Sequence, residues 1–186
     1  MIRFASAAAA SLLFASAALA GTDLTFPAFT GISTHGGAAV VLRHGAVQRV
    51  TVVKGDLSKA DIHLNGKSLD ISPCKAWCVN SGEFKVEIVS PRIEDIQAHG
   101  GGALKAEGDF PKQPMLNLQA HGGGAINVRA IPAETVHAQA HGGGVIKLQA
   151  LSSIDAQANG GGVISFAGNP PHIISQSHGG GAISKE

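Results

Sequence analysis

A glycine-rich motif recurs through the C-terminal half of the chain and constrains its fold more than any other feature. The motif reads His-Gly-Gly-Gly and begins at His99, His121, His141 and His178, while Asn159 opens the same run of three glycines. Successive motifs lie 18 to 22 residues apart. A unit this short cannot bury an apolar face alone, so its repetition predicts a stack of similar units that share one core.

The residues around the motif fall into columns when the repeats are aligned. Two places before the motif every repeat has a glutamine, and five places after its first residue every repeat has leucine or isoleucine. The two columns are Gln97, Gln119, Gln139, Gln157 and Gln176, and Leu104, Ile126, Ile146, Ile164 and Ile183. Identical columns favour parallel, in-register stacking over antiparallel hairpins, because adjacent hairpin strands would reverse the order of the residues.

Apolar and polar residues alternate on both sides of the glycines, as expected for strands with one buried face. Each repeat is therefore predicted to form a strand, a Gly corner, a second strand and a turn. Glycine permits positive φ at the corner, and coils stacked about 4.8 Å apart would share one aliphatic interior. The variation in repeat length falls in four turns, at 108–115, 130–135, 150–153 and 168–172.

These patterns predict an all-β fold, a single-domain β-solenoid at residues 21–186 with about 18–22 residues per coil. Residues 91–186 hold the regular repeats, and residues 21–90 are interpreted as less regular opening coils. His35-Gly36-Gly37 is read as an earlier, degenerate corner. Residues 61–71 predict a hairpin, because Asn65-Gly66 suits a tight type I′ turn.

From about Phe29 to Glu186 the chain resembles a known family of bacterial exported domains. The resemblance is carried by Phe29-Thr30-Gly31-Ile32, the strand Gly66–Ile71, the segment Ser90–Ile93 and the Gly-rich repeats. The family is the head GIN domain family, whose members are described as putative autotransporter adhesins. The resemblance implies an exported, right-handed parallel β-helix in the bacterial envelope, and an adhesin-like role.

The first twenty residues have the order of a secretory signal peptide. Arg3 supplies a positive start, an apolar run follows, and small residues close the segment before Ala20, where cleavage is expected. No later segment approaches the roughly 20 apolar residues that span a bilayer, so no membrane span is expected. No cysteine lies near the cut, so no lipid anchor is expected. The predicted location is the periplasm or the cell surface.

The two cysteines and the net charge give further expectations, about a disulfide and about the partners that the protein can bind. Cys74 and Cys78 are a close pair in an exported chain, which favours a local disulfide over free thiols or a metal pair. The chain has 14 basic and 13 acidic residues, and removal of residues 1–20 removes only Arg3 among them, so the mature net charge is 13 − 13 = 0. A neutral chain has no electrostatic footprint for nucleic acid.

The histidine column is the most interesting candidate site. His99, His121 and His141 should face outward on successive coils, where neutral imidazoles could share Zn²⁺ or Cu²⁺. The alternative is that histidine fills an exposed corner and stacks. Asn159 favours stacking, because it keeps hydrogen bonding and loses strong metal ligation.

No enzyme is predicted. The acidic residues are scattered, and no pair of them recurs between coils. Two functions remain open: a non-catalytic envelope or surface module that contacts a polymer or protein, and a metal- or pH-responsive binding protein that uses the histidine column. The partner polymer or protein is not specified by the sequence, no cofactor is expected beyond the Zn or Cu hypothesis, and an open solenoid end could support a homo-oligomer.

Overall fold

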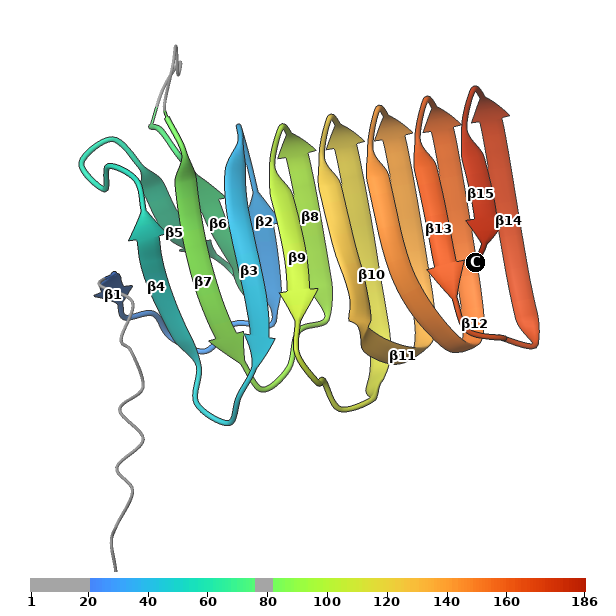
Figure 1. Ribbon diagram of the computed structural model, residues 1–186, viewed down its shortest axis with the longest axis horizontal. Helices are drawn as coiled ribbons and strands as arrows, with labels where there is room; N and C mark the ends of the chain where they lie inside the picture. The colour runs from blue at the N-terminus through green and yellow to red at the C-terminus, as the bar shows by residue number, and fades with distance from the viewer. Residues whose placement is uncertain (1–20, 76–81) are drawn as a thin grey trace, which may run out of the picture.

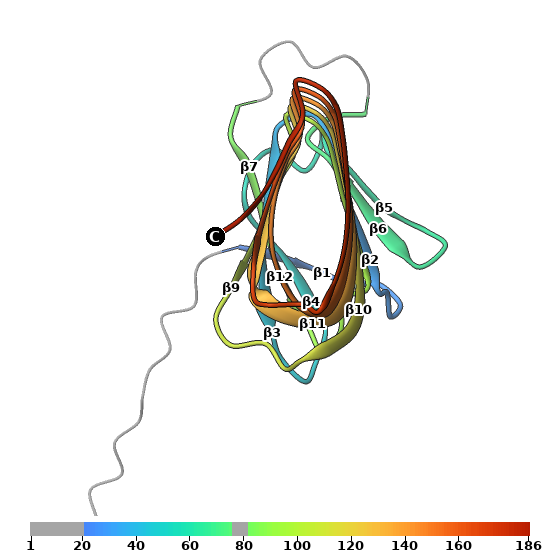
Figure 2. The same ribbon diagram turned by 90° about the vertical axis from the view of Figure 1, so that its right-hand side faces the viewer.

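The computed structural model describes residues 21–75 and 82–186, which form an all-β protein (Figure 1). Within these residues, fifteen strands join one hydrogen-bonded sheet that wraps into a flattened solenoid (Figure 2). The described residues contain no helix that is long and apolar enough to cross a membrane. The strands are β1 (Thr22–Leu24), β2 (Gly31–Thr34), β3 (Ala38–His44), β4 (Arg49–Lys54), β5 (Asp61–Asn65), β6 (Ser68–Ser72), β7 (Phe84–Ser90), β8 (Asp95–Gly100), β9 (Ala103–Glu107), β10 (Gln113–Gly122), β11 (Ala125–Gly142), β12 (Val145–Gly160), β13 (Val163–Ala167), β14 (His172–Gly179) and β15 (Ala182–Lys185).

Each coil has a strand on the rear sheet and a strand on the front sheet, as oriented in Figure 1. The rear sheet contains β6, β2, β8, β10, the second halves of β11 and β12, and β14; the front sheet contains β7, β3, β9, the first halves of β11 and β12, β13 and β15. The rear strands run up to the Gly corners and the front strands run down from them while the chain advances toward its C-terminus (Figures 1 and 2). The solenoid is therefore right-handed, as the family resemblance implied.

The regular coils stack parallel and in register, which confirms the prediction from the columns. In β10 and β11, Gln119 pairs with Gln139 and His121 with His141. The column five residues after the motif points inward, and Ile146 is fully buried. Every coil thus adds one layer to a continuous aliphatic core, because the identical register places each inward residue on its equivalent in the next coil.

The three glycines of each corner serve different geometric needs. The corner is a tight turn in which the third glycine donates its amide to the histidine carbonyl, as in the 3.1 Å bond from Gly124 N to His121 O. The first glycine, for example Gly122, has φ +65°, a conformation that side chains disfavour. The third glycine is buried: a Cβ on Gly124 would lie 2.2 Å from the carbonyl oxygen of Ala98 in the preceding coil.

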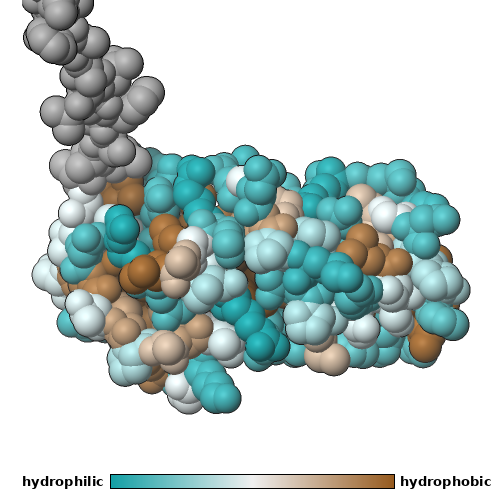
Figure 3. Space-filling view, turned by 90° about the horizontal axis from the view of Figure 1, so that it is seen from below, coloured by the Kyte–Doolittle hydropathy of each residue, from teal (hydrophilic) through white to brown (hydrophobic). Residues whose placement is uncertain are grey.

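The lower edge of the solenoid is less regular than the Gly corners. Two predicted turns are loops, since 108–112 and 168–171 lie between strands. The prediction of loops at 130–135 and 150–153 is wrong, because β11 and β12 continue through these segments. The physical reason is that Ala133 pairs with Ala150 and both are buried, so the two strands stay paired around the edge. The register shifts on either side of this pair, between Asn127 and Pro132 and between Ala133 and Thr135. Seen from below, this edge mixes hydrophilic and hydrophobic residues without regular columns (Figure 3).

The N-terminal coils do not stack in chain order. The coil of β2 and β3 lies between the coil of β6 and β7 and the coil of β8 and β9. Strands β4 and β5 then pair antiparallel with β7 and β6. The predicted hairpin is confirmed as β5–β6, although its two central residues are Gly66 and Lys67, one residue later than Asn65-Gly66.

Candidate binding faces

The outward residues of the rear sheet form a polar face built from parallel columns. We call its two longest columns the His ladder (His35, His99, His121 and His141) and the Gln ladder (Gln97, Gln119, Gln139, Gln157 and Gln176). A third column beside the Gln ladder contains Asp95, Asn117, His137 and Asp155. The in-register stacking brings these side chains together, because residues at equal positions in successive coils stand on one line.

The structure brings the three predicted histidines together and adds a fourth. The rings of His99 and His121, and those of His121 and His141, stack with centroids 5.0 Å apart and planes within 4°. His35 stacks on His99 at 4.9 Å. His35 was missing from the predicted site, although His35-Gly36-Gly37 was correctly interpreted as an early corner.

Burial and the neighbouring imidazoles affect the protonation of His99, which lies inside this ladder. Burial lowers the pKa of His99 below its ordinary value, and the charges that His35 and His121 would carry lower it further. A positive charge on either stacked neighbour would repel a positive charge on His99, so the neutral form of His99 is favoured. Beyond His141, Asn159 places its side-chain nitrogen 3.4 Å from the ring of His141. The ladder therefore continues by polar contact where histidine is absent.

The geometry of the His ladder does not support a metal site. The lone pairs of an imidazole lie in the plane of its ring, so parallel stacked rings direct their nitrogens side by side and not toward a common point. Among residues 21–75 and 82–186, no three His, Cys, Asp or Glu side chains are grouped to hold a metal ion. The rings stack, as the alternative expects, and metal binding by His99, His121 and His141 stays a prediction.

The Gln ladder is the least satisfied part of the polar face. Within the described chain, the side chains of Gln119, Gln139 and Gln157 form no hydrogen bond with protein groups. These amides are half-buried and recur once per coil. Each offers one carbonyl acceptor and two N–H donors, so the ladder is a row of equivalent hydrogen-bonding groups directed at the solvent.

A shallow pocket of about 300 Å³ lies between the Gln ladder and the third column. Its lining residues are Asp95, Asn117, Leu118, Gln119, His137 and Gln139. The amide of Asn117 donates to Asp95 over 2.9 Å, which fixes both side chains. One coil further, the Oδ1 atom of Asp155 is buried and has no hydrogen-bond partner in the described structure. The pocket and its surroundings thus present hydrogen-bond acceptors and donors side by side.

The carboxylates of Asp95 and Asp155 are too far apart to act together as a glycosidase pair. Asp95 and Asp155 occupy the same column three coils apart, so about 14 Å separates their backbones. The paired carboxylates of glycosidases lie within roughly 10 Å of each other. The Nδ1 atom of His137 lies 3.9 Å from Asp155, beyond hydrogen-bond distance. The arrangement of Asp95, Asn117, His137 and Asp155 can hold a polar ligand through hydrogen bonds.

Two sequence predictions concern residues outside the described chain. The signal peptide with its cut after Ala20 is one of them. The other is the Cys74–Cys78 disulfide, because Cys78 lies outside the described ranges. Cys74 itself follows β6, where its carbonyl accepts a 2.8 Å hydrogen bond from Ser72. Both remain predictions.

The sequence matches the family model described as "Putative auto-transporter adhesin, head GIN domain" over residues 28–115 and 112–170. The chain belongs to this family. The resemblance seen in the Gly-rich repeats is thus confirmed. No curated protein matches the sequence.

Solved structures share the fold of this head GIN domain protein. One is a putative adhesin from Bacteroides fragilis, with 18% identity and a TM-score of 0.54 over 89% of this chain and 96% of that chain. Another is named a putative lipid binding protein, from Parabacteroides distasonis, with 15% identity and a TM-score of 0.50 over 89% and 96% of the two chains. At these identities the similarity shows the fold alone.

Proposed function

We propose that this protein is a non-catalytic, adhesin-like module of the bacterial envelope that binds an extended polymer along its polar face. The observation that carries the proposal is the Gln ladder, whose side-chain amides recur once per coil. At Gln119, Gln139 and Gln157 these amides form no hydrogen bond with the described part of the protein. A half-buried amide without a partner gains free energy when a ligand satisfies it. A row of them favours a ligand that repeats its own polar groups.

A polymer is favoured over a small ligand because the face has translational symmetry. Successive coils present the same amide and, in the His ladder, the same imidazole at intervals of about 5 Å. A polyhydroxylated chain that lies along the solenoid axis would meet equivalent groups at each step. Individually weak contacts along one molecule then combine, because the later contacts form intramolecularly.

The chemistry of the face favours an uncharged, polar polymer. Its long columns contain Gln, His and Asn, with the carboxylates Asp95 and Asp155 and no lysine or arginine among them. Hydroxyl groups both donate and accept hydrogen bonds, as amides do, so a polysaccharide can satisfy both atoms of each glutamine side chain. The predicted signal peptide and membership of an adhesin family support an exported location, where such polymers occur.

The binding assay should compare variants of the two faces. Gln119→Ala, Gln139→Ala and the double variant remove amides from the ladder, while Asn127→Ala removes an amide from the front sheet of the same coils. We expect the mature protein to be retained by at least one immobilised neutral polysaccharide. The double Gln variant should weaken retention about tenfold or more, and Asn127→Ala should leave it unchanged.

Unchanged retention of the double Gln variant would refute the assignment to the polar face. A loss shared equally by Asn127→Ala would do the same. Retention that requires added Zn²⁺ or Cu²⁺ and disappears in His121→Asn would instead support the metal-responsive alternative, for which the described geometry gives no support.

A further inference from the structure

The front sheet carries an apolar groove of about 310 Å³ on the opposite side of the solenoid from the polar face. Its floor is one outward column, formed by Ala39, Ala103, Ala125 and Val145, which pair in register. The next outward column forms one wall, with Val41, Lys105, Asn127 and Lys147. The groove therefore runs along the solenoid axis and crosses the strands.

The floor breaks the ordinary pattern of a half-buried strand. Outward positions are usually polar, as they are in the His and Gln ladders of the rear sheet, yet four consecutive coils place a methyl or isopropyl group there. Val163 continues the column toward the C-terminus and is 37% exposed. In the other direction the column ends at Lys85, which pairs with Ala39. From Ala39 to Val145 the apolar floor spans three coil spacings, about 14 Å.

Only one lysine that lines the groove lacks a compensating carboxylate. Lys105 is held by Glu107, whose Oε1 atom lies 2.9 Å from its Nζ, and this contact lowers the pKa of Glu107. Lys147 forms no ion pair within the described residues. Its ammonium group therefore stands at the edge of an apolar surface without a partner of opposite charge.

We propose that this groove binds the monomer of a single-chain anionic amphiphile, of the fatty-acid type. The alkyl chain would lie on the floor from Ala125 to Ala39, and the carboxylate would pair with Lys147. The groove is separate from the polar face, so this proposal can be tested independently of the function proposed above.

The shape and chemistry of the groove favour this occupant over others. A β-strand of a partner would need free backbone groups, but the groove crosses strands that are already paired on both sides, such as β9 and β11. A sugar would leave the methyl groups of the floor against polar atoms. A narrow, straight apolar track with a cation at its side matches one alkyl chain with one anionic end.

Binding of decanoate to the mature protein tests the proposal, measured by isothermal titration calorimetry at concentrations where decanoate is monomeric. We expect one site per chain. Affinity should rise about two- to fourfold for each methylene added between hexanoate and decanoate, because each buries apolar surface on the floor. Decanol, which has the same tail without the charge, should bind about two- to fivefold more weakly, because Lys147 is exposed and an exposed ion pair contributes up to about 1 kcal/mol. Rising salt should weaken decanoate more than decanol.

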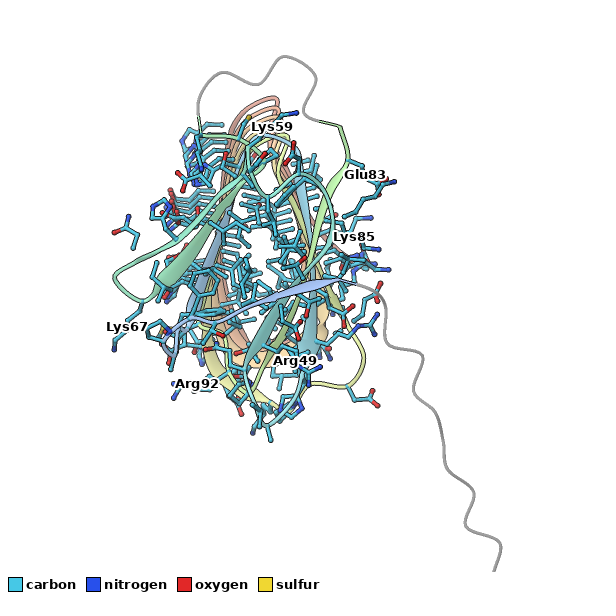
Figure 4. All side chains as sticks on the ribbon, turned by 90° about the vertical axis from the view of Figure 1, so that its left-hand side faces the viewer. Arg49, Lys59, Lys67, Glu83, Lys85 and Arg92 are labelled. Atoms are coloured by element: carbon cyan, nitrogen blue, oxygen red, sulfur yellow. The ribbon has the colours of Figure 1, made fainter. Side chains whose placement is uncertain are left out.

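Two pairs of variants locate the site. Ala125→Phe fills the floor from an outward position and should reduce decanoate affinity at least tenfold, whereas Thr135→Phe places the same ring on the rear sheet and should not. Lys147→Gln should reduce the preference for decanoate over decanol. Lys67→Gln removes a charge from the β5–β6 hairpin, on the rear side opposite Lys85, and should leave that preference intact (Figure 4).

Far-UV circular dichroism and the urea unfolding midpoint of each variant establish that it folds. Undiminished decanoate binding by folded Ala125→Phe would overturn the groove assignment. Equal affinity for decanol and decanoate would overturn the anionic requirement. Binding to phosphatidylglycerol vesicles in the absence of any affinity for decanoate would overturn the assignment to a single-chain monomer.

Discussion

Replacement of the third glycine of a corner should destabilise the protein more than replacement of the first. In the corner at His141, a Cβ on Gly144 would lie 2.4 Å from the carbonyl oxygen of Ala120 and 2.9 Å from its carbonyl carbon. Both atoms belong to the backbone of the preceding coil, so neither can rotate away. Gly142→Ala meets no atom closer than 3.5 Å, but its φ of +67° becomes strained.

The expected costs follow from these two mechanisms. Overpacking against a fixed backbone costs typically 1–3 kcal/mol. Separation of the coils at Gly144 would also lengthen the 2.9 Å hydrogen bond from Val145 N to Gly124 O, which is worth about 1 kcal/mol. We therefore expect Gly144→Ala to cost about 3 kcal/mol. Gly142→Ala should cost about 1–2 kcal/mol, the penalty for a left-handed residue with a side chain.

Equilibrium urea unfolding, followed by far-UV circular dichroism, measures both costs. Gly66→Ala is the matched control, because Gly66 has φ +63° and a Cβ at this position would meet no atom within 4 Å, so the substitution isolates backbone strain. Its cost should equal that of Gly142→Ala. If Gly144→Ala unfolds at the same urea concentration as the other two variants, close contact between coils does not explain the third glycine.

Three further predictions concern the core, the His ladder and the cysteines. Ile146→Asp buries an unpaired charge in the shared interior and should cost at least about 3 kcal/mol in urea unfolding, whereas the outward Lys147→Asp should change stability by no more than about 0.5 kcal/mol. Burial and neighbouring imidazoles lower the pKa of His99, so this imidazole binds a proton more readily in the unfolded chain than in the folded protein. The free energy of unfolding should therefore fall as the pH drops through the unfolded pKa of histidine, near 6.5. Urea unfolding between pH 7 and pH 5 should show a smaller fall for His99→Asn. The predicted Cys74–Cys78 bridge implies no free thiol in a thiol assay on denatured, unreduced protein, and two thiols per chain would contradict it.

The regular part of the fold could be predicted from the sequence, because the same residue types recur at fixed positions of every repeat and these positions determine the register. Glutamine at one fixed position and isoleucine at another identified the outward and inward sides, and the structure places them there. The histidine stack followed from the same alignment. His35 could have been predicted as a member of the stack only if its shorter His-Gly-Gly corner had been aligned with the longer His-Gly-Gly-Gly corners.

The order of the N-terminal coils could not be predicted in this way. Residues 31–44 carry only one marker of the repeat, and residues 68–90 carry none. Which of these coils contacts β8 and β9 depends on side-chain packing between segments far apart in the chain. The structure places Val40 against both Val86 and Leu104, so the earliest coil is the inner one. The alternation of apolar and polar residues predicts that these coils exist, but it does not specify which coil stacks on which.

The apolar groove shows how a repeat can encode two unlike surfaces at once. One residue type at one position becomes a line of side chains along the solenoid axis, because every coil repeats the same register. On the rear sheet that rule turns single Gln and His positions into polar ladders, and on the front sheet it turns the position after the third glycine into a track of methyl groups. The sequence signal for the track was present in Ala103, Ala125 and Val145, which are apolar where the strand faces solvent.

Columns also determine how each surface can change. A substitution in one coil changes a column at one step and leaves the neighbouring steps intact, as Asn159 does between His141 and His178. Binding that depends on a whole column should therefore weaken gradually as substitutions accumulate along it. A preference that depends on a single group, such as the preference of the groove for an anionic end beside the ammonium of Lys147, should be lost in one step. The two proposed sites differ in this respect: polymer retention should fall in steps as Gln119, Gln139 and Gln157 are replaced in turn, whereas the choice between decanoate and decanol should change with Lys147 alone.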